Sequence, residues 1–380
     1  MRFDDEQPNK VGFNSIQNTF SISSNSTRRK YNGLKFNYLA YNLYASYGTQ
    51  NTQAKENKEV VNGAKNTRPA ANLSLQIGKG NGRLEYVTDA VSAQFLAKDL
   101  SAKLGIEFSE NQLYELSKGI THIKNQRYLD FRFKFIDQVA MLDSVLKTND
   151  INAKDNLIYF TTLSDNWLYA TRLNRYSGKR WTYMLDLYNQ LSAEDLLSYN
   201  NTGNITDYEL YHNNYFFSRE GFLATFDQST QKSLTVQKER GFSVGAYYEQ
   251  RRAADEYTFG QGNVPRRMQN PDIDIEPALS LKISGYWSCM YQPNTRNYFT
   301  FTLYPRVDLD KGISLNSDRF EITPALSSYL NYYKWISPQL NFRVGCNFSV
   351  RNSFGLADYQ PNNVTQSSQS LNAGFAYQFY

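Results

Sequence analysis

The sequence predicts a mainly β protein, an antiparallel transmembrane β-barrel of about 11 to 12 strands with an inserted helical subdomain. Three observations support this fold class. Hydrophobic and polar residues alternate over long segments, aromatic residues are unusually frequent, and the connections between the C-terminal segments alternate in length.

The composition favours a barrel over a helical membrane protein. Mean hydropathy is −0.61, and no apolar stretch approaches the ~18 residues that a spanning helix needs. The 380 residues include 30 Tyr, 24 Phe and 4 Trp, and Tyr and Trp are typical of both edges of a bilayer. A tyrosine-rich soluble sandwich or a glycan-binding surface is the alternative. The net charge of +5 is too small and too dispersed to indicate a nucleic-acid partner.

The C-terminal hundred residues contain the clearest strands. In each run, apolar residues occupy one face and polar residues the other, as Phe299 and Phe301 oppose Thr300 and Thr302. Such runs exceed the five or six residues usual in soluble sheets and suit strands that cross a bilayer at a tilt. The five runs lie near 277–290, 296–308, 318–331, 340–351 and 371–379.

The connections between these runs are alternately short and long. They are tight at 292–294 and 333–335, longer at 310–316, and longest at 352–365. Short periplasmic turns and longer external loops are typical of outer-membrane barrels.

The chain end resembles the C-terminal assembly signal of bacterial outer-membrane proteins. Gly374 is followed by aromatic residues at or near alternate positions, namely Tyr377, Phe379 and Tyr380. The resemblance implies the barrel assembly machinery as a partner.

Upstream, weaker strands are predicted near 11–23, 33–47, 70–78, 180–190, 215–227 and 232–250. We therefore expect barrel strands over 1–78 and 180–380, with external loops at 51–67 and 253–274. The resulting count of eleven is odd, whereas bacterial single-chain barrels normally have an even number. Because Met1 is also followed by no apolar leader, we expect at least one further strand upstream, unless the count is off by one.

Between these parts, residues 79–179 are predicted to form a helical insertion. Apolar residues follow helical spacing from Thr88 or Asp89 as N-cap to Gly105 as the stop. Ser109 and Gln112 form a capping box before a second helix. Further helices are expected over 126–147 and 155–172. By the strand count the insertion leaves the barrel on its periplasmic side, and we favour a periplasmic bundle over a plug in the lumen.

Two segments of this region carry a family resemblance. Residues 78–90 read GKGNGRLEYVTDA and residues 123–132 read IKNQRYLDFR. Both resemble an uncharacterised family of Bacteroidota outer-membrane β-barrel proteins with a helical insertion. The resemblance implies an outer-membrane location and no established activity.

The candidate site consists of charged residues on the polar faces of the C-terminal strands, which would line the lumen of a barrel. An open basic lumen would favour anions, whereas a packed lumen would hold salt bridges. The lumen-lining candidates are Lys282, Arg306, Arg319, Glu321, Arg343 and Arg351.

Other motifs indicate no catalytic, metal or cofactor site. The glycines of G78-x-G80-x-G82 lack phosphate-loop spacing and are interpreted as a flexible exit from the barrel. His122 has no Cys, Asp or His at ligand spacing. His212 has Tyr211, Asn213 and Asn214 beside it, and its nearest serine in sequence is Ser218. Cys289 and Cys346 lie on apolar faces too far apart for a disulfide, so both are predicted to be free thiols facing lipid.

These observations favour an outer-membrane protein for porin-like passage of solutes. A non-transporting envelope protein is the alternative, anchoring surface glycan or a partner complex through its helical insertion. An outer-membrane hydrolase is the second alternative. The expected partners are outer-membrane lipid and a periplasmic protein at the insertion.

Overall fold

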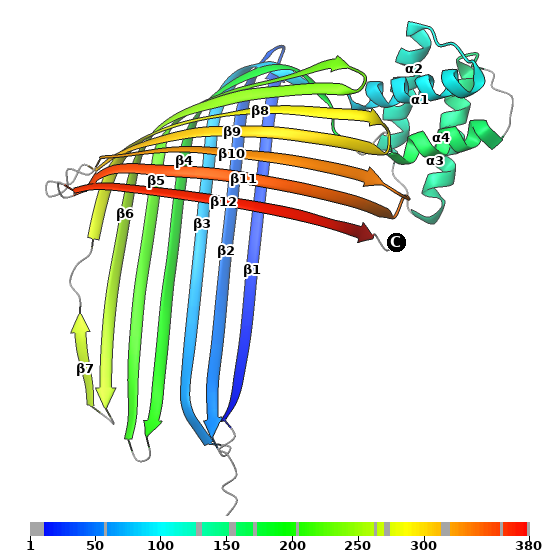
Figure 1. Cartoon of the computed structure of the whole chain (residues 1–380). Helices are drawn as coiled ribbons and strands as arrows, with labels where there is room; N and C mark the ends of the chain where they lie inside the picture. The colour runs from blue at the N-terminus through cyan, green and yellow to red at the C-terminus, as the bar shows by residue number, and fades with distance from the viewer. Residues whose placement is uncertain are drawn as a thin grey trace, which may run out of the picture.

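The computed structural model describes residues 11–56, 59–126, 131–151, 157–169, 173–202, 205–261, 264–269, 274–312, 320–357 and 360–377. These residues form one antiparallel sheet and four helices (Figure 1). Before the helices come β1 (Val11–Asn32), β2 (Lys35–Glu56) and β3 (Glu59–Tyr86). After them come β4 (Tyr176–Thr202), β5 (Ile205–Ser233), β6 (Val236–Gln261), β7 (Val264–Gln269), β8 (Asp274–Asn294), β9 (Asn297–Gly312), β10 (Phe320–Trp335), β11 (Leu340–Ala357) and β12 (Gln360–Tyr377).

Each strand pairs with its neighbour in the sequence, except that β8 follows β6 in the sheet and the short β7 pairs with β6 alone. Figure 1 shows the sheet strongly coiled, so that β8–β12 run at a steep angle to β1–β3. The edges of the sheet are β1 and β12, which do not pair with each other over the described residues. The antiparallel order and the strand length confirm the fold class predicted for a transmembrane β-barrel, although this sheet is not closed.

The strands are longer than the sequence predicts. Both external loops, 51–67 and 253–274, were expected to be irregular, and this expectation was wrong for most of their residues. The pairing of β2 with β3 continues from Thr49–Thr67 to Glu56–Glu59, and β6 continues to Gln261. The β2–β3 end is mostly polar and so gives no clear period-two signal even though it pairs, and the β6 end has too few large apolar residues, Tyr257 and Phe259, to predict a strand.

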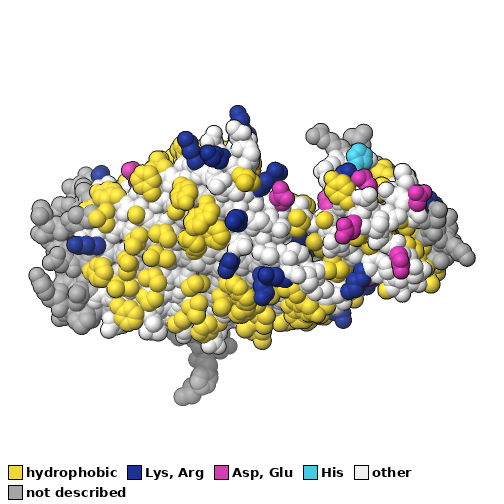
Figure 2. All heavy atoms as spheres, turned by 90° about the horizontal axis from the view of Figure 1, so that it is seen from above, with side chains coloured by type: hydrophobic (Ala, Val, Ile, Leu, Met, Phe, Trp, Pro, Cys, Tyr) yellow, Lys and Arg dark blue, Asp and Glu magenta, His cyan; other side chains and the backbone are white. Residues whose placement is uncertain are grey.

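The register gives the sheet two unlike faces. On one, the apolar face, large hydrophobic side chains are exposed; on the other, the polar face, charged and small residues predominate. Figure 2 shows hydrophobic side chains spread over the visible part of the sheet, whereas the helical end carries most of the visible acidic groups. Exposed residues of the apolar face include Leu185, Phe222, Phe242, Ile283, Phe299, Leu326, Phe348 and Phe375.

Close packing of glycines in β3 contradicts their interpretation as a flexible exit. A Cβ added to Gly80 would lie 2.0 Å from Cζ of Phe36, and one at Gly78 would lie 2.1 Å from the Tyr183 carbonyl oxygen. Glycine is therefore needed because neighbouring groups approach its backbone closely. Phe36 belongs to a small buried cluster on the polar face that also contains Tyr38 and Met184.

The helical insertion contains α1 (Thr88–Leu104), α2 (Glu110–Asn125), α3 (Phe131–Thr148) and α4 (Leu157–Tyr169), which confirms the four predicted helices. β3 continues to Tyr86 and β4 begins at Tyr176, so both strands extend into the predicted insertion. The predicted stop at Gly105 is confirmed by its left-handed backbone, with φ of 67°, and the Ser109–Gln112 capping box is also present.

The predicted N-cap of α1 was wrong. The cap is Val87, which makes no side-chain cap hydrogen bond. The Thr88 hydroxyl does not cap the helix, because it accepts a hydrogen bond from the Arg175 backbone amide at 2.7 Å. Thr88 therefore joins the two ends of the insertion rather than capping the helix.

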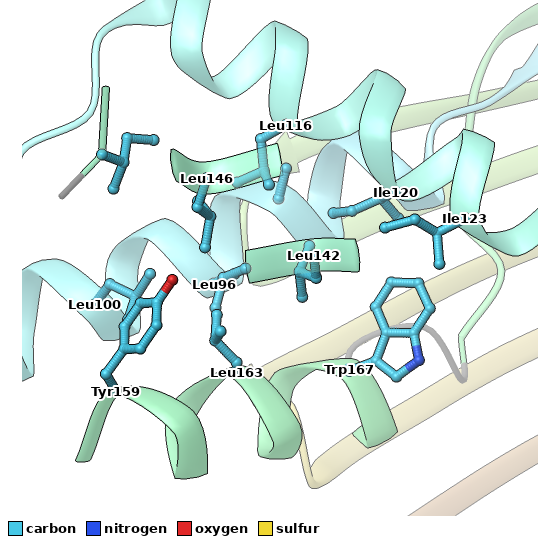
Figure 3. Packing of buried hydrophobic residues seen from close by; sticks show 12 residues of the cluster. Leu96, Leu100, Leu116, Ile120, Ile123, Leu142, Leu146, Tyr159, Leu163 and Trp167 are labelled. Carbon is cyan, nitrogen blue, oxygen red and sulfur yellow. The ribbon is translucent and has the colours of Figure 1, made fainter. Parts of the chain in front are cut away.

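The four helices share a hydrophobic core (Figure 3). Buried leucines and isoleucines of α1 and α2 meet Leu142 and Leu146 of α3 and Leu163 of α4. The Trp167 ring closes one end of this core and donates from Nε1 to Gln138 at 3.0 Å. Within the described residues, no helix is long and apolar enough to cross a membrane.

The helices lie at one end of the sheet. They connect β3 to β4 at the end that also carries the tight turns after β1, β5 and β8, together with the C-terminal end of β12 (Figure 1). The opposite end carries the hairpins between β2 and β3 and between β4 and β5.

Candidate functional site

The polar face brings most of the predicted lumen-lining residues together. Cross-strand pairing puts Lys282 of β8 on the same face as Arg306 of β9, Glu321 of β10, and Arg343 and Arg351 of β11. Arg319 lies outside the described residues. That these side chains line a lumen stays a prediction.

Two of these cations are ion-paired along the sheet. Lys282 donates from Nζ to Glu249 of β6 at 2.5 Å, and the Glu249 side chain is only 6% exposed. Arg306 binds Asp308 of the same strand at 2.7 Å. Lys282 and Arg306 therefore form salt bridges and do not present free positive charge on this face.

A second part of the polar face, on β3–β6, was not predicted as a site. Asp186 accepts from Arg219 at 3.0 Å and from Gln76 at 3.0 Å, and its side chain is 2% exposed. The Arg219 guanidinium lies over the Tyr247 ring, 4.7 Å from its centroid. A similar pair joins Arg180 to Asp227 at 2.8 Å. The alternation within 180–190 and 215–227 could have assigned these residues to one face, but not their partners.

The remaining candidates lie towards the edge formed by β12. Glu321 accepts hydrogen bonds from Ser353 and from Thr323 at 3.1 Å. Arg351 borders a cavity of about 250 Å³ together with Ser353, Val364 and Gln366. No carboxylate of the described residues forms an ion pair with Arg343 or Arg351. Four ion pairs of the described residues thus lie on β4–β9 of the polar face, whereas β11 carries the basic side chains of Arg343 and Arg351.

The predicted assembly signal lies on β12 at the helical end of the sheet. Gly374 pairs with Arg343, and the Tyr377 hydroxyl donates to Gln339 at 2.7 Å. Phe379 and Tyr380 lie outside the described residues. The signal's role in assembly stays a prediction.

The helical end of the sheet contains a buried arginine that the sequence did not single out. Arg175 is 1% exposed and donates from Nη2 to Gln292 Oε1 at 2.6 Å, while its backbone carbonyl accepts from Val87 at 2.9 Å. Burial lowers the pKa of the Arg175 guanidinium to about 10, because the charged form loses hydration, although Glu239 opposes this effect. Arg175 thereby fixes the exit from the helices against the C-terminal end of β8.

A second contact holds α4 against the sheet. Arg296, in the turn between β8 and β9, forms an ion pair with Asp165, which raises the pKa of the guanidinium. Its charge also lies 4.6 Å from the centroid of the Tyr169 ring, within the range of a cation–π contact. Tyr169 in turn faces Trp335 at 6.5 Å between centroids.

The two histidines lie on different elements, His212 on β5 and His122 on α2. His212 contacts Asp195 through Nδ1 and Asn214 through Nε2 at 2.7 Å. Ser218 lies further along the same strand and is not among these partners. His122 ends α2 and contacts Gln126 at 3.4 Å. No cluster of three metal-ligating side chains occurs among the described residues.

Both cysteines are free thiols, as predicted. Cys289 shares the apolar face of β8 with Ile283, and Cys346 that of β11 with Phe348. Their contact with lipid stays a prediction.

The long antiparallel strands and the two unlike faces define the fold class of a transmembrane β-barrel, with the sheet not closed. No protein-family model matches the chain, and no curated protein matches it either. Among solved structures it is similar to the translocator domain of autotransporter NalP from Neisseria meningitidis, at 10% identity over 97% of this chain and 87% of that one, with a TM-score of 0.26. OmpT, an outer membrane protein of Vibrio cholerae, gives 9% identity over 98% of both chains and a TM-score of 0.23. The CymD monoaromatic hydrocarbon channel gives 7% identity over 97% and 88%, with a TM-score of 0.22. These scores are too low to transfer a function.

Proposed function

We propose that this protein is an outer-membrane β-barrel that passes small polar solutes along its polar face. The observation that supports this proposal most directly is the contrast between the two faces of one continuous sheet. Large hydrophobic side chains are exposed on the apolar face, as lipid contact requires, while four ion pairs of the described residues lie on β4–β9 of the polar face. On this proposal the polar face lines the lumen.

The pairing determines what could pass. Lys282 and Glu249, and likewise Arg219 and Asp186, cancel each other's charge at short range. We therefore expect a weakly selective passage for small neutral or zwitterionic solutes rather than an anion channel. Arg343 and Arg351 would add a local preference for anionic groups near β11.

Planar-bilayer conductance tests the proposal. The folded protein is expected to give discrete, small conductance steps with little preference for K⁺ or Cl⁻. Glu249→Gln removes one acidic partner and should shift the reversal potential towards anion preference. A correctly folded protein that passes neither ions nor small sugars into liposomes would reject the transport proposal; retention of heat-modifiable gel mobility reports correct folding.

A second function is supported by the helical insertion, which has its own core and is held to the sheet by Arg175 and Arg296. On this proposal the helices are a periplasmic domain that binds an envelope partner, and the barrel is only an anchor. Apolar side chains at the start of α4 remain exposed, with Leu157 79% and Ile158 52% exposed.

Cysteine labelling in whole cells tests the side of the membrane. Lys118 lies on α2 with half of its side chain exposed. A Lys118→Cys variant, with Cys289 and Cys346 changed to Ser, should react with an impermeant maleimide only after the outer membrane is permeabilised. Labelling of intact cells would place the helices on the cell surface and reject the periplasmic domain.

A further inference from the structure

The apolar face carries a groove that crosses four strands. It has a volume of about 560 Å³, and three consecutive residues from each of β3, β4, β5 and β6 line it. In pairing order they form three rows across the sheet. The first row is Ala71, Leu191, Phe216 and Arg252; the second is Ala70, Ser192, Tyr215 and Ala253; the third is Pro69, Ala193, Asn214 and Ala254.

The order of the rows shows which face is hollowed. Successive residues of a strand point to opposite faces, so the first and third rows share a face and the second points away. Leu191 and Phe216 belong to the apolar face, because they are in phase with Leu185 and Phe222 on the same strands. The side chains of the first and third rows are therefore the walls of the groove, and the backbone of the second row is its floor.

Small side chains make the groove possible. Three members of the third row are Pro69, Ala193 and Ala254, so this wall is low, while Leu191 and Phe216 form a taller apolar wall opposite. A hydrocarbon chain fits such a trough, since nearly all of the exposed lining is carbon. Arg252 stands at one end of the taller wall and is exposed.

The groove lies where polar residues interrupt the apolar face. On β4 this face runs from Trp181 through Leu185 to Leu191, changes to Ala193 and Asp195, and has a further apolar residue at Leu197. Asp195 contacts His212 across the strands, on the same face. Arg252 is therefore a cation beside a polar interruption of the apolar face, a position that suits a lipid headgroup.

We propose that this groove binds a phosphorylated membrane lipid, with one acyl chain between the two walls and a phosphate on Arg252. The inference rests on the proposed membrane location of the sheet, but not on solute passage. Arginine suits this role because its guanidinium donates in a planar fork to phosphate oxygens. The groove lies towards the end of the sheet away from the helices, so we expect the lipid in the leaflet opposite the helical domain.

The chain provides a matched control. Arg251 is adjacent to Arg252 on β6 and carries the same charge, but it points to the polar face, where its guanidinium lies 5.8 Å from the centroid of the Phe217 ring. Arg252→Gln should therefore affect lipid binding, and Arg251→Gln should not. Ala193→Leu fills the trough without a change of charge.

Native mass spectrometry of the detergent-purified full chain, titrated with lipid A, tests the proposal. Arg252→Gln is expected to weaken binding about tenfold, which is typical of one charge-assisted contact. Dephosphorylated lipid A should bind the wild type as weakly as lipid A binds Arg252→Gln, Ala193→Leu should lower binding of both lipids, and inorganic phosphate should not compete.

Equal binding by Arg252→Gln and the wild type would overturn the proposal. So would an equal loss in Arg251→Gln, because it would show a general effect of charge. Conductance is measured separately on the same variants. A variant that loses conductance but keeps lipid binding is altered in solute passage and not in the groove. A variant that loses lipid binding but keeps conductance is altered in the groove and not in solute passage. A protein that fails to enter bilayers at all rejects the membrane location itself.

Discussion

The ion pair between Lys282 and Glu249 offers the sharpest test of how the polar face is built. The Glu249 side chain is 6% exposed and the Lys282 side chain 23%. Lys282→Met would leave the buried carboxylate without its cation. Removal of one partner of a fully buried pair costs about 3–5 kcal/mol, and the partial exposure of Lys282 reduces our expectation to about 2–3 kcal/mol.

Glu249→Gln should cost less, about 1–2 kcal/mol, because Lys282 can turn towards water when its partner is lost. The double variant should be less destabilised than the sum of the single variants. We expect a coupling free energy of about 1–3 kcal/mol, as is usual for residues in direct contact within one network.

Urea unfolding in lipid vesicles, followed by tryptophan fluorescence, measures these free energies. Arg343→Met is the control, since Arg343 pairs with no carboxylate in the described part of the chain and its loss should cost well under 1 kcal/mol. A coupling energy within about 0.3 kcal/mol of zero would mean that Lys282 and Glu249 are hydrated separately. The inference of a charge-paired face would then be wrong, and a wide aqueous lumen would take its place.

Three further variants test other parts of the structure. Gly80→Ala drives a methyl group against the Phe36 ring and should destabilise the sheet by about 1–3 kcal/mol in the same urea assay; unchanged stability would show that the ring moves freely. Leu142→Ala opens a cavity in the helical core and should lower its stability by about 2–5 kcal/mol. Amide hydrogen exchange should become faster in the helices but not in the sheet. An equal rise in both would contradict two separate cores. Arg296→Gln removes the ion pair to Asp165 and should weaken docking of α4 by at most about 1 kcal/mol. Amide exchange near the end of α4 should therefore rise no more than about fivefold. A rise across the whole sheet would refute a local contact.

The sequence predicts the C-terminal strands well because one physical pattern dominates them. In 340–351, every second residue is apolar, and this pattern sets both the strand and its two faces. The helices were predicted for a similar reason, since Ser109 and Gln112 lie at capping-box spacing and Gly105 ends α1. These signals are local, so a single sequence contains them.

The missed features depend on residues distant in the sequence. The glycine at position 80 is required by the Phe36 ring on a different strand, and nothing near Gly80 indicates that contact. The contact between Arg219 and Asp186 can be predicted only when the register of β4 and β5 is known. The hairpin ends at 51–67 and 253–261 were also missed, because strands with few large apolar residues resemble loops in composition.

The pairing of Tyr86 with Tyr176 has a consequence for the history and engineering of this chain. The two residues are register partners, and their rings lie 5.8 Å apart, so the whole helical unit begins and ends where a two-residue turn would. Segments whose ends lie close together can be gained or lost without moving the elements on either side. A hairpin with a short turn here would keep every strand in register, and other domains could be grafted onto the same point.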